Sequence, residues 1–427
     1  MSRRRRYGFR GRGSLSAAVA LVLLASILSG CRQTGPSAAG PTSSTSPPPV
    51  TATSSAPTPS VTPASWRRIA HPPYTDGSVA WSGQEVFLVH AWPTWDKATN
   101  VTHCIERVAA YTPSTDSWRT LPPGPAITPH ECRWGGGADA AVWTGDELVL
   151  WGATNAAYDP TTNSWRRLTA PPPMDDLTPE VTVWTGRQML GWGYLDCCDI
   201  SSPEGSSLTP ATGVQRRLPR SPLQGGAAPM GVWTGSELII AGGGYEGGYV
   251  YDDVAAYRPA TRSWRTLAPM PIARMEGTAL WDGTELLIFD GIGGRNLESG
   301  RDPNLRTRQL ARGVAYNPTT DRWRWLSAPE QPRVDAAYAW DGHEVLMWGG
   351  IGLDRSIPSH GEAFDPATNT WSPLPASPLR ARVWPTAVWT DGEWIIWGGG
   401  DARSFAADGD WKPLTDGAAF TPASTSR

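Results

Sequence analysis

Several common signatures are missing from this sequence. Its longest apolar run, Leu15 to Leu28, is shorter than the roughly 20 residues that cross a bilayer, so no transmembrane helix is expected. There is no glycine-rich nucleotide loop, no His-Glu-x-x-His pair and no Gly-x-Ser-x-Gly elbow. Nucleotide-hydrolysing, zinc-protease and serine-hydrolase chemistry are therefore not indicated.

Lysine is almost absent, occurring only at Lys97 and Lys412, so arginine carries nearly all the positive charge. This usage is typical of high-GC genomes and suggests an actinobacterial source. Without the first 30 residues, which hold six arginines and no acid, 31 basic residues face 40 acidic ones, a formal charge of −9. A nucleic-acid partner is not expected, since nucleic-acid binders show the opposite balance.

The first 30 residues have the layout of a bacterial export signal. Arg3 to Arg6 form a positive start, Leu15 to Leu28 the apolar core, and Leu28-Ser29-Gly30-Cys31 resembles the lipobox of bacterial lipoproteins. We expect cleavage before Cys31 and lipidation of its thiol, with export by the Sec or the twin-arginine route. The predicted location is the extracytoplasmic side of the cell membrane, reached through a lipid anchor only. Residues 31–64 are rich in Pro, Ser and Thr and are expected to form a disordered spacer.

A hairpin motif recurs along the rest of the chain. A Trp is followed by Thr-Gly, Asp-Gly or a similar turn, by Glu or Gln at the fourth position, and by an apolar run. Two apolar segments joined by such a turn predict a tight β-hairpin, whose arms we name strands a and b. The seven copies begin at Trp81, Trp143, Trp184, Trp233, Trp281, Trp340 and Trp389, spaced by 41 to 62 residues.

A second motif follows most hairpins: an aromatic residue, x-Pro, Thr and then Trp. Pro and short polar residues between two aromatic segments predict a turn joining two further strands, c and d. The motif runs from Tyr111 to Trp118, Tyr158 to Trp165, Tyr257 to Trp264, Tyr316 to Trp323 and Phe364 to Trp371.

Four strands per unit, with glycine pairs after strand b and paired Tyr and Trp in strands c and d, resemble the kelch repeat. The resemblance implies an all-β kelch-type β-propeller of about seven four-stranded blades over residues 65–415, with a flexible tail at 416–427. Blade 3 is degenerate, and Phe405 to Trp411 is expected to supply strands c and d of blade 7. Either Ser65 to Ile69 or Trp411 to Leu414 could close the ring. Most tryptophans are expected to pack between blades, and Trp92, Trp95, Trp134 and Trp384, outside the register, are candidates for carbohydrate stacking.

The connections between strands b and c, and between d and a, are long and vary from blade to blade. They lie on one face of an antiparallel propeller, here named the b–c face, and variable loops on a rigid scaffold often bind ligands. The candidate ligand-binding residues on this face are arginines ahead of hairpin Trp residues and the side chains next to them. An anion or sugar-acid site with bidentate arginines and a salt-bridged structural rim are both open. The residues are Arg133, Arg274, Glu276, Arg333, Asp335, Arg382 and Trp384.

The remaining cysteines are even in number, as a disulfide framework in an oxidising compartment requires. Cys104 and Cys132 fall in neighbouring connections and are predicted to pair. The adjacent Cys197 and Cys198 could form a strained vicinal disulfide, remain free or cross-pair. His103, His130 and Glu131 beside the first pair offer metal ligands, but the spacing is not that of a structural zinc site, so no metal is expected.

Three functions fit a propeller of this kind. The first is a monomeric surface module that binds a glycan, a cell-wall fragment or a protein. The second is a copper-radical oxidase like galactose oxidase, for which no Tyr/Cys/His set matches. The third is a sugar enzyme resembling the kelch mutarotases that act on sialic acid, with Glu276, Asp335 or His360 as acid or base. Sialidase-type Ser-x-Asp-x-Gly-x-Thr-Trp boxes are absent. The sequence favours the binding module, without cofactor or catalytic activity.

Overall fold

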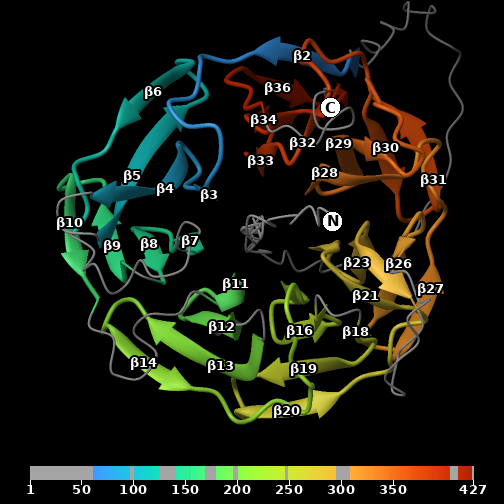
Figure 1. The fold of residues 1–427 in the computed structure, drawn as a ribbon, viewed down its shortest axis with the longest axis horizontal. Coiled ribbons are helices and arrows are strands. Elements are labelled where there is room, and N and C mark those ends of the chain that lie inside the picture. Colours follow the sequence, from blue (N-terminus) through green and yellow to red (C-terminus); the bar gives the residue numbers. More distant parts are fainter. Residues whose placement is uncertain are drawn as a thin grey trace, which may run out of the picture.

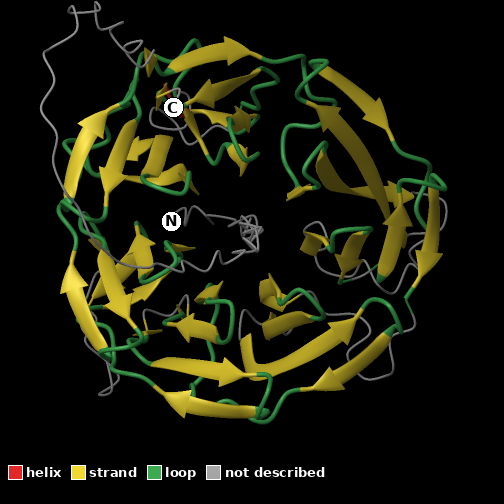
Figure 2. Ribbon diagram, turned by 180° about the vertical axis from the view of Figure 1, so that it is seen from behind, coloured by secondary structure: helices red, strands yellow, loops and turns green. Residues whose placement is uncertain are grey.

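The structure is a computed structural model that describes residues 61–96, 101–125, 140–152, 154–168, 179–195, 201–245, 249–294, 308–403 and 412–425. Its regular elements are strands, arranged as seven four-stranded antiparallel sheets around a central axis (Figures 1 and 2). The predicted seven-bladed β-propeller is therefore confirmed. No helix within the described ranges is long and apolar enough to cross a membrane.

Each blade runs from strand a at the centre to strand d at the circumference (Figure 1). Blades 1 to 3 consist of β3 (Ser78–Trp81), β4 (Val86–Asp96), β5 (Val101–Thr112) and β6 (Ser117–Thr120); β7 (Ala140–Trp143), β8 (Leu148–Trp151), β9 (Ala156–Asp159) and β10 (Ser164–Arg167); and β11 (Pro179–Trp184), β12 (Met189–Leu195), β13 (Ser201–Thr209) and β14 (Val214–Arg217). Blades 4 and 5 consist of β15 (Met230–Trp233), β16 (Leu238–Ala241), β19 (Val254–Arg258) and β20 (Ser263–Thr266); and β22 (Thr278–Trp281), β23 (Leu286–Phe289), β26 (Val314–Asn317) and β27 (Arg322–Trp325). Blades 6 and 7 consist of β28 (Arg333–Trp340), β29 (Val345–Gly352), β30 (Glu362–Asp365) and β31 (Thr370–Pro373); and β33 (Thr386–Trp389), β34 (Trp394–Trp397), β36 (Gly417–Thr421) and β2 (Ser65–Arg68).

The ring is closed by the two ends of the chain. Strand β2 pairs with β36, which pairs with β34, so the N-terminal strand is the outermost strand of blade 7. This settles which segment closes the ring. The expected boundary at residue 415 falls short, because β36 supplies strand c at Gly417–Thr421. Phe420 and Trp66 are paired in the register that Tyr111 and Trp118 have in blade 1. Residues 404–411, within the stretch expected to hold this unit, lie outside the described residues.

Hydrophobic side chains fill the seven contacts between neighbouring blades. One buried cluster lies at each contact; that between blades 7 and 1, for example, contains Trp81, Tyr111 and Trp397. Trp151, Trp192, Trp348, Trp394 and Trp397 are almost completely buried. Inter-blade packing of the tryptophans in the repeat is thus confirmed, and it follows because a twisted sheet can bury its faces only against the next blade.

The tryptophan of strand d also connects consecutive blades by a hydrogen bond. In six blades its indole N–H donates to a carbonyl oxygen of the segment that leaves the preceding blade, at 2.8–3.0 Å. Blade 3 is the exception, because Gln215 takes the place of this Trp and donates to Ser206. The six pairs are Trp118 with Ala70, Trp165 with Pro122, Trp264 with Pro219, Trp323 with Ala268, Trp371 with Ser327 and Trp66 with Pro375.

The glutamate four residues after the hairpin Trp has a repeated role as well. In five blades it forms an ion pair with the arginine that follows the strand d aromatic, at 2.5–2.8 Å. Blade 3 has the arginine, Arg216, but Gln188 in place of the acid. Blade 6 has the acid, Glu344, but Ser372 in place of the arginine. The five pairs are Glu85–Arg119, Glu147–Arg166, Glu237–Arg265, Glu285–Arg324 and Glu393–Arg67.

Candidate functional site

Most of the strands that extend beyond the seven blades lie on one face of the ring. At the opposite face, strands a and b join through uniform turns; in blade 1, the Ser82 hydroxyl accepts the backbone N–H groups of Gln84 and Glu85. On the b–c face, β4 and β5 continue together far past the blade, pairing up to Asp96 with Val101. Residues 91–96 and 101–107, expected to belong to a b–c loop, are therefore paired β-strands in their backbone. Backbone pairing continues there because strands β4 and β5 stay in register.

Smaller sheets lie on the same face of blades 4, 5 and 7. They are β17 (Gly244–Tyr245) with β18 (Tyr249–Val250), β21 (Ala273–Met275) with β24 (Ile292–Gly294) and β25 (Arg308–Gln309), and β32 (Arg382–Val383) with β35 (Gly400–Asp401). A further pair, β1 (Val61–Thr62) with β37 (Ser424–Thr425), extends blade 7 from the two chain ends. In blades 5 to 7, strands a and b thus continue toward the b–c face beyond a point where the pairing between them is interrupted.

The three predicted arginines lie on these continuations and point into the protein. Arg274 and Arg382 have no exposed surface and Arg333 retains 2%. Arg274 donates to the carbonyl oxygens of Asp290 and Arg312. Arg382 donates to the carbonyl oxygens of Arg380, Gly398 and Asp416 and to the Asp416 carboxylate at 2.8 Å.

Arg333 has the same kind of environment. It donates to the carbonyl oxygens of Gln331 and His360 and forms a buried ion pair with Glu362 at 2.5 Å. These contacts occupy the guanidinium groups with the protein's own acceptors, and the geometry supports the salt-bridged structural rim. Arg133 lies outside the described residues. Glu362 and the carbonyl acceptors were missed, because no local spacing links them to the arginines.

Two residues after each arginine, the chain enters the left-handed backbone region. The φ values are 59° at Glu276, 60° at Asp335 and 49° at Trp384, and Ala228 has the same conformation in blade 4. This bend lets the N–H group of Trp384 reach the carbonyl oxygen of Asp335 in blade 6, at 2.9 Å. The N–H group of Glu276 likewise donates to the carbonyl oxygen of Ala228. The bend positions therefore join neighbouring blades around the central channel.

The structure brings Asp335 and Trp384 together but leaves Glu276 apart from them. The indole N–H of Trp384 donates to Oδ1 of Asp335 at 2.8 Å, and Oδ2 of Asp290 accepts the N–H of Asp335 at 3.0 Å. Glu276 is exposed. Asp290 was missed by sequence reasoning, although a signal existed. The position nine residues after the hairpin Trp is glycine in five blades and departs from glycine only at Asp290 and at His90 of blade 1: Gly152, Gly193, Gly242, Gly349 and Gly398 are the five glycines.

His90 forms a second polar cluster at the equivalent place in blade 1. Its Nδ1 lies 3.4 Å from Oδ1 of Asp76, and its ring stacks on Tyr74 with centroids 4.9 Å apart. The contact with His90 lowers the pKa of Asp76. The carbonyl oxygen of the intervening Thr75 accepts the N–H of Gly399 from blade 7, so this cluster lies at the seam where the ring closes.

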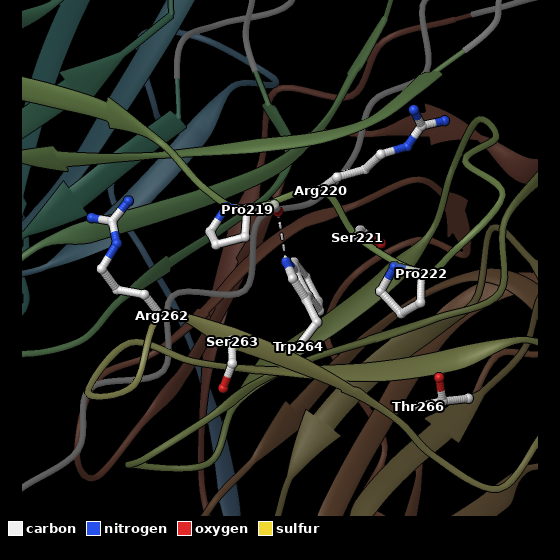
Figure 3. Close-up of a pocket in the computed structure, with 8 residues that line it drawn as sticks. All are labelled: Pro219, Arg220, Ser221, Pro222, Arg262, Ser263, Trp264 and Thr266. Carbon is white, nitrogen blue, oxygen red and sulfur yellow. Dashed lines mark hydrogen bonds between the residues drawn. The ribbon is translucent and has the colours of Figure 1, made fainter.

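A shallow groove of about 480 Å³ lies between strand β20 and the segment that follows β14 (Figure 3). Trp264 of β20 lies at its centre, with its indole bonded to the carbonyl oxygen of Pro219. Pro219 and Pro222 lie on either side of it, and Arg220 and Arg262 extend from the rim. The groove follows from the inter-blade tryptophan bond and gathers no titratable group besides the two arginines.

Other predicted site residues are described only in part. Cys104 and His103 lie on β5, opposite Pro93 and Thr94, and Trp92 and Trp95 lie on β4. The lipidation site Cys31, the cysteines Cys132, Cys197 and Cys198, and Trp134 lie outside the described residues, so the disulfides stay predictions. Within the described ranges, no group of three or more His, Cys, Asp and Glu side chains is placed to hold a metal ion.

Comparisons with known proteins agree with this architecture. No protein-family model matches the chain. Kelch-like protein 25 of Xenopus tropicalis is 29% identical over 175 residues, covering 40% of this chain and 28% of that protein. Kelch repeat and BTB domain-containing protein 13 of Homo sapiens is 31% identical over 129 residues, which cover 29% of this chain and 25% of that protein. An F-box/kelch-repeat protein of Arabidopsis thaliana is 26% identical over 143 residues, which cover 30% of this chain and 38% of that protein. The matched segments thus span less than two fifths of these relatives' own lengths.

Among solved structures, a fungal alcohol oxidase of the AA5 family in complex with copper is similar in fold. The TM-score is 0.58 at 14% sequence identity, over 84% of this chain and 76% of the oxidase chain. This likeness concerns the fold alone. The repeat, the ring of seven blades and the comparisons together establish that this chain is a kelch-repeat β-propeller with a galactose oxidase-like fold.

Proposed function

We propose that this protein is a binding module, held at the extracytoplasmic side of the membrane by a lipid on Cys31, whose b–c face engages a glycan, a cell-wall fragment or a protein. The observation that carries the proposal is the one-sided elaboration of the ring. Apart from the short β1–β37 pair, which lies at the c–d end of blade 7, the strand extensions described above lie on the b–c face, whereas the a–b turns of the opposite face are short and uniform. Extra structure on one face of a rigid scaffold is what a binding surface requires.

The buried arginines favour this function over a sugar enzyme with an arginine clamp. A clamp must present free donors to the substrate. Arg333 and Arg382 instead direct every guanidinium nitrogen to carbonyl or carboxylate oxygens of the protein. A binding surface formed by the projecting strands needs none of these donors.

The proposal is tested with the chain from Arg32 onward, screened on a glycan array, against soluble peptidoglycan fragments and as bait for surface proteins. In the test variant, residues 91–106 are replaced by Asn-Gly, because His90 and Arg107 are already paired and a two-residue turn suits their register. The matched control, Gln84→Ala with Asp146→Ala, changes exposed turns of the opposite face.

We expect the test variant to lose binding by tenfold or more and the control to keep it. Loss in the control alone would move the site to the opposite face. A folded protein that binds nothing in the three screens would contradict the proposal.

A further inference from the structure

Asp290 occupies a position that is glycine in five of the other six blades. In blades 4 and 7 a Cβ at this position would collide with the carbonyl oxygen of Arg274 or Thr75 in the next blade. Asp290 adopts the same left-handed backbone, with φ of 60°. Its side chain is therefore directed at blade 6, where Oδ2 accepts the N–H of Asp335 at 3.0 Å.

The contact continues from blade 6 to blade 7. Oδ1 of Asp335 accepts the indole N–H of Trp384 at 2.8 Å, and the carbonyl oxygen of Asp335 accepts the backbone N–H of Trp384 at 2.9 Å. Three consecutive blades are thus joined at their inner ends through two carboxyl groups. The bends at Asp335 and Trp384, both at positive φ, direct these groups toward one another.

The charges around Asp290 come from three elements. Burial first, and the negative charge of Asp335 second, raise the pKa of Asp290 to about 8. The backbone N–H groups of Gly291 and Asp335, which donate to this carboxyl, and then the charge of Arg274 of β21 act in the opposite direction. Arg274 also binds the carbonyl oxygen of Asp290. Its Nε is buried and has no hydrogen-bond partner among the described residues.

The remaining neighbours lie on β28 and β30. Burial and the charge of Asp290 raise the pKa of Tyr338 well above its usual value. Beyond Tyr338, Arg333 is paired with Glu362 and lowers the pKa of Tyr338, while Glu362 raises it. Burial and the charge of Asp335 thus bring the pKa of the Asp290 carboxyl close to neutral pH.

We propose that Asp290, Asp335 and Trp384 form a proton-dependent latch across the inner ends of blades 5, 6 and 7. With a proton on Asp290, its buried carboxyl group carries no charge beside Asp335, and both hydrogen bonds hold. When Asp290 is charged, its burial and its repulsion by Asp335 outweigh the stronger bond from the Asp335 N–H, so the carboxylate turns toward water or Arg274 and the tie between blades 5 and 6 loosens. The latch lies on the b–c face, so its state alters the spacing of the elements on that face.

The direction of the pH dependence follows from proton linkage. Asp290 holds its proton up to about pH 8 in the folded protein, whereas an unfolded chain releases it near pH 4. Between these values the folded state binds more protons than the unfolded state, so rising pH lowers the free energy of unfolding. Above about pH 8, Asp290 is ionised in both states, so its contribution to the free energy of unfolding no longer changes with pH.

The test is the melting temperature of the mature chain between pH 5 and pH 9.5, for the wild type and for Asp290→Asn. Asparagine tolerates the left-handed backbone and can accept the Asp335 N–H, so it mimics the protonated acid. We expect the wild type to lose about 3–5 °C relative to this variant as the pH rises. Asp290→Gly, which restores the residue of the other blades, is expected to remove the same pH dependence should the asparagine variant fold poorly.

Two further variants test the pair itself. Asp335→Asn removes the second charge, so the decline should remain but move to lower pH. Asp146→Asn, in the exposed a–b turn of blade 2, should keep the wild-type profile. Hydrogen exchange of the peptides around residues 335 and 384 should show opening above pH 8 in the wild type only. Parallel melting curves for the wild type and Asp290→Asn over the whole range would overturn the latch. None of these measurements needs a ligand, so the result is independent of the proposed function.

Discussion

The buried ion pair between Arg333 and Glu362 is the residue contact on which the inner rim of blade 6 depends most directly. Both side chains are almost fully buried, and each leaves an uncompensated charge when its partner is removed. We expect Arg333→Ala to lower the free energy of unfolding by about 3–5 kcal/mol. Urea unfolding followed by far-UV circular dichroism measures this loss.

A double variant separates charge from packing at this pair. Replacing Arg333 by Met and Glu362 by Leu removes both charges and keeps most of the volume, so most of the stability should return. An Arg333→Ala protein as stable as the wild type would instead show that the guanidinium is free for a ligand, in favour of the anion site.

Blade 6 lacks one partner of the ion pair that the other blades repeat. Burial, and next the charge of Asp341, raise the pKa of Glu344, since Ser372 stands where five blades have arginine. We expect Ser372→Arg to form the pair and to stabilise the protein by about 0.5–1 kcal/mol. Chemical denaturation at pH 7 measures the gain.

The gain should depend on pH in a defined direction. In the wild type, ionisation of Glu344 costs stability as the pH rises; in the variant, the ionised form is the paired one. The stabilisation by Ser372→Arg should therefore be present at pH 7 and vanish near pH 3. Ser372→Gln, which has length without charge, is the control and should show no such difference.

At the scale of strands, the repeats made most of the propeller predictable. Trp, a turn and Glu or Gln recur seven times without a break in register, so the hairpins could be placed from local pattern alone. The outer strands of blade 7 could not be placed in this way, because Phe420 completes its aromatic pair with Trp66, more than 350 residues away. The local signal was nevertheless present, since Phe420-Thr421-Pro422 begins like the other strand c motifs.

Truncation tests this corrected boundary. A chain ending at residue 415 lacks β36, so β34 and β2 both lose their partner. We expect it to be insoluble or to melt at least 10 °C below the wild type, because blade 7 and the ring closure fail together. A chain that ends at residue 425 retains β36 and is the control. Equal melting temperatures for the two chains would show that the propeller closes without β36.

The candidate site shows where sequence pattern stops being sufficient. Equal spacing from the hairpin Trp correctly placed Arg274, Arg333 and Arg382 at equivalent positions on the b–c face. It could not show that their side chains point inward, because their acceptors are carbonyl oxygens and acids brought close only by the fold. Asp290 was detectable only as an exception to glycine, and glycine is needed there because the next blade passes close by.

The arrangement of the whole chain favours a propeller held away from the membrane. In the proposed anchored form, cleavage before Cys31 leaves a formal charge of −9, which anionic lipid headgroups are expected to repel. The Pro-rich sequence of residues 32–64 is expected to act as a spacer between the propeller and the membrane. The b–c face can then meet ligands without competition from the lipid surface.

In the cell, the proposed lipid anchor on Cys31 can be tested by labelling. Because the apolar run of residues 15–28 is too short to span the bilayer, the proposed attachment would depend on a diacylglycerol on Cys31. We expect a clickable fatty acid supplied to an expressing bacterium to label the wild type and Cys104→Ser, and not Cys31→Ser. The Cys31→Ser protein should also lose its attachment to washed membranes, unless its leader stays uncleaved, and intact mass distinguishes that case. Fatty-acid label on Cys31→Ser, or a wild-type protein without label, would contradict the anchor and leave a secreted propeller in its place.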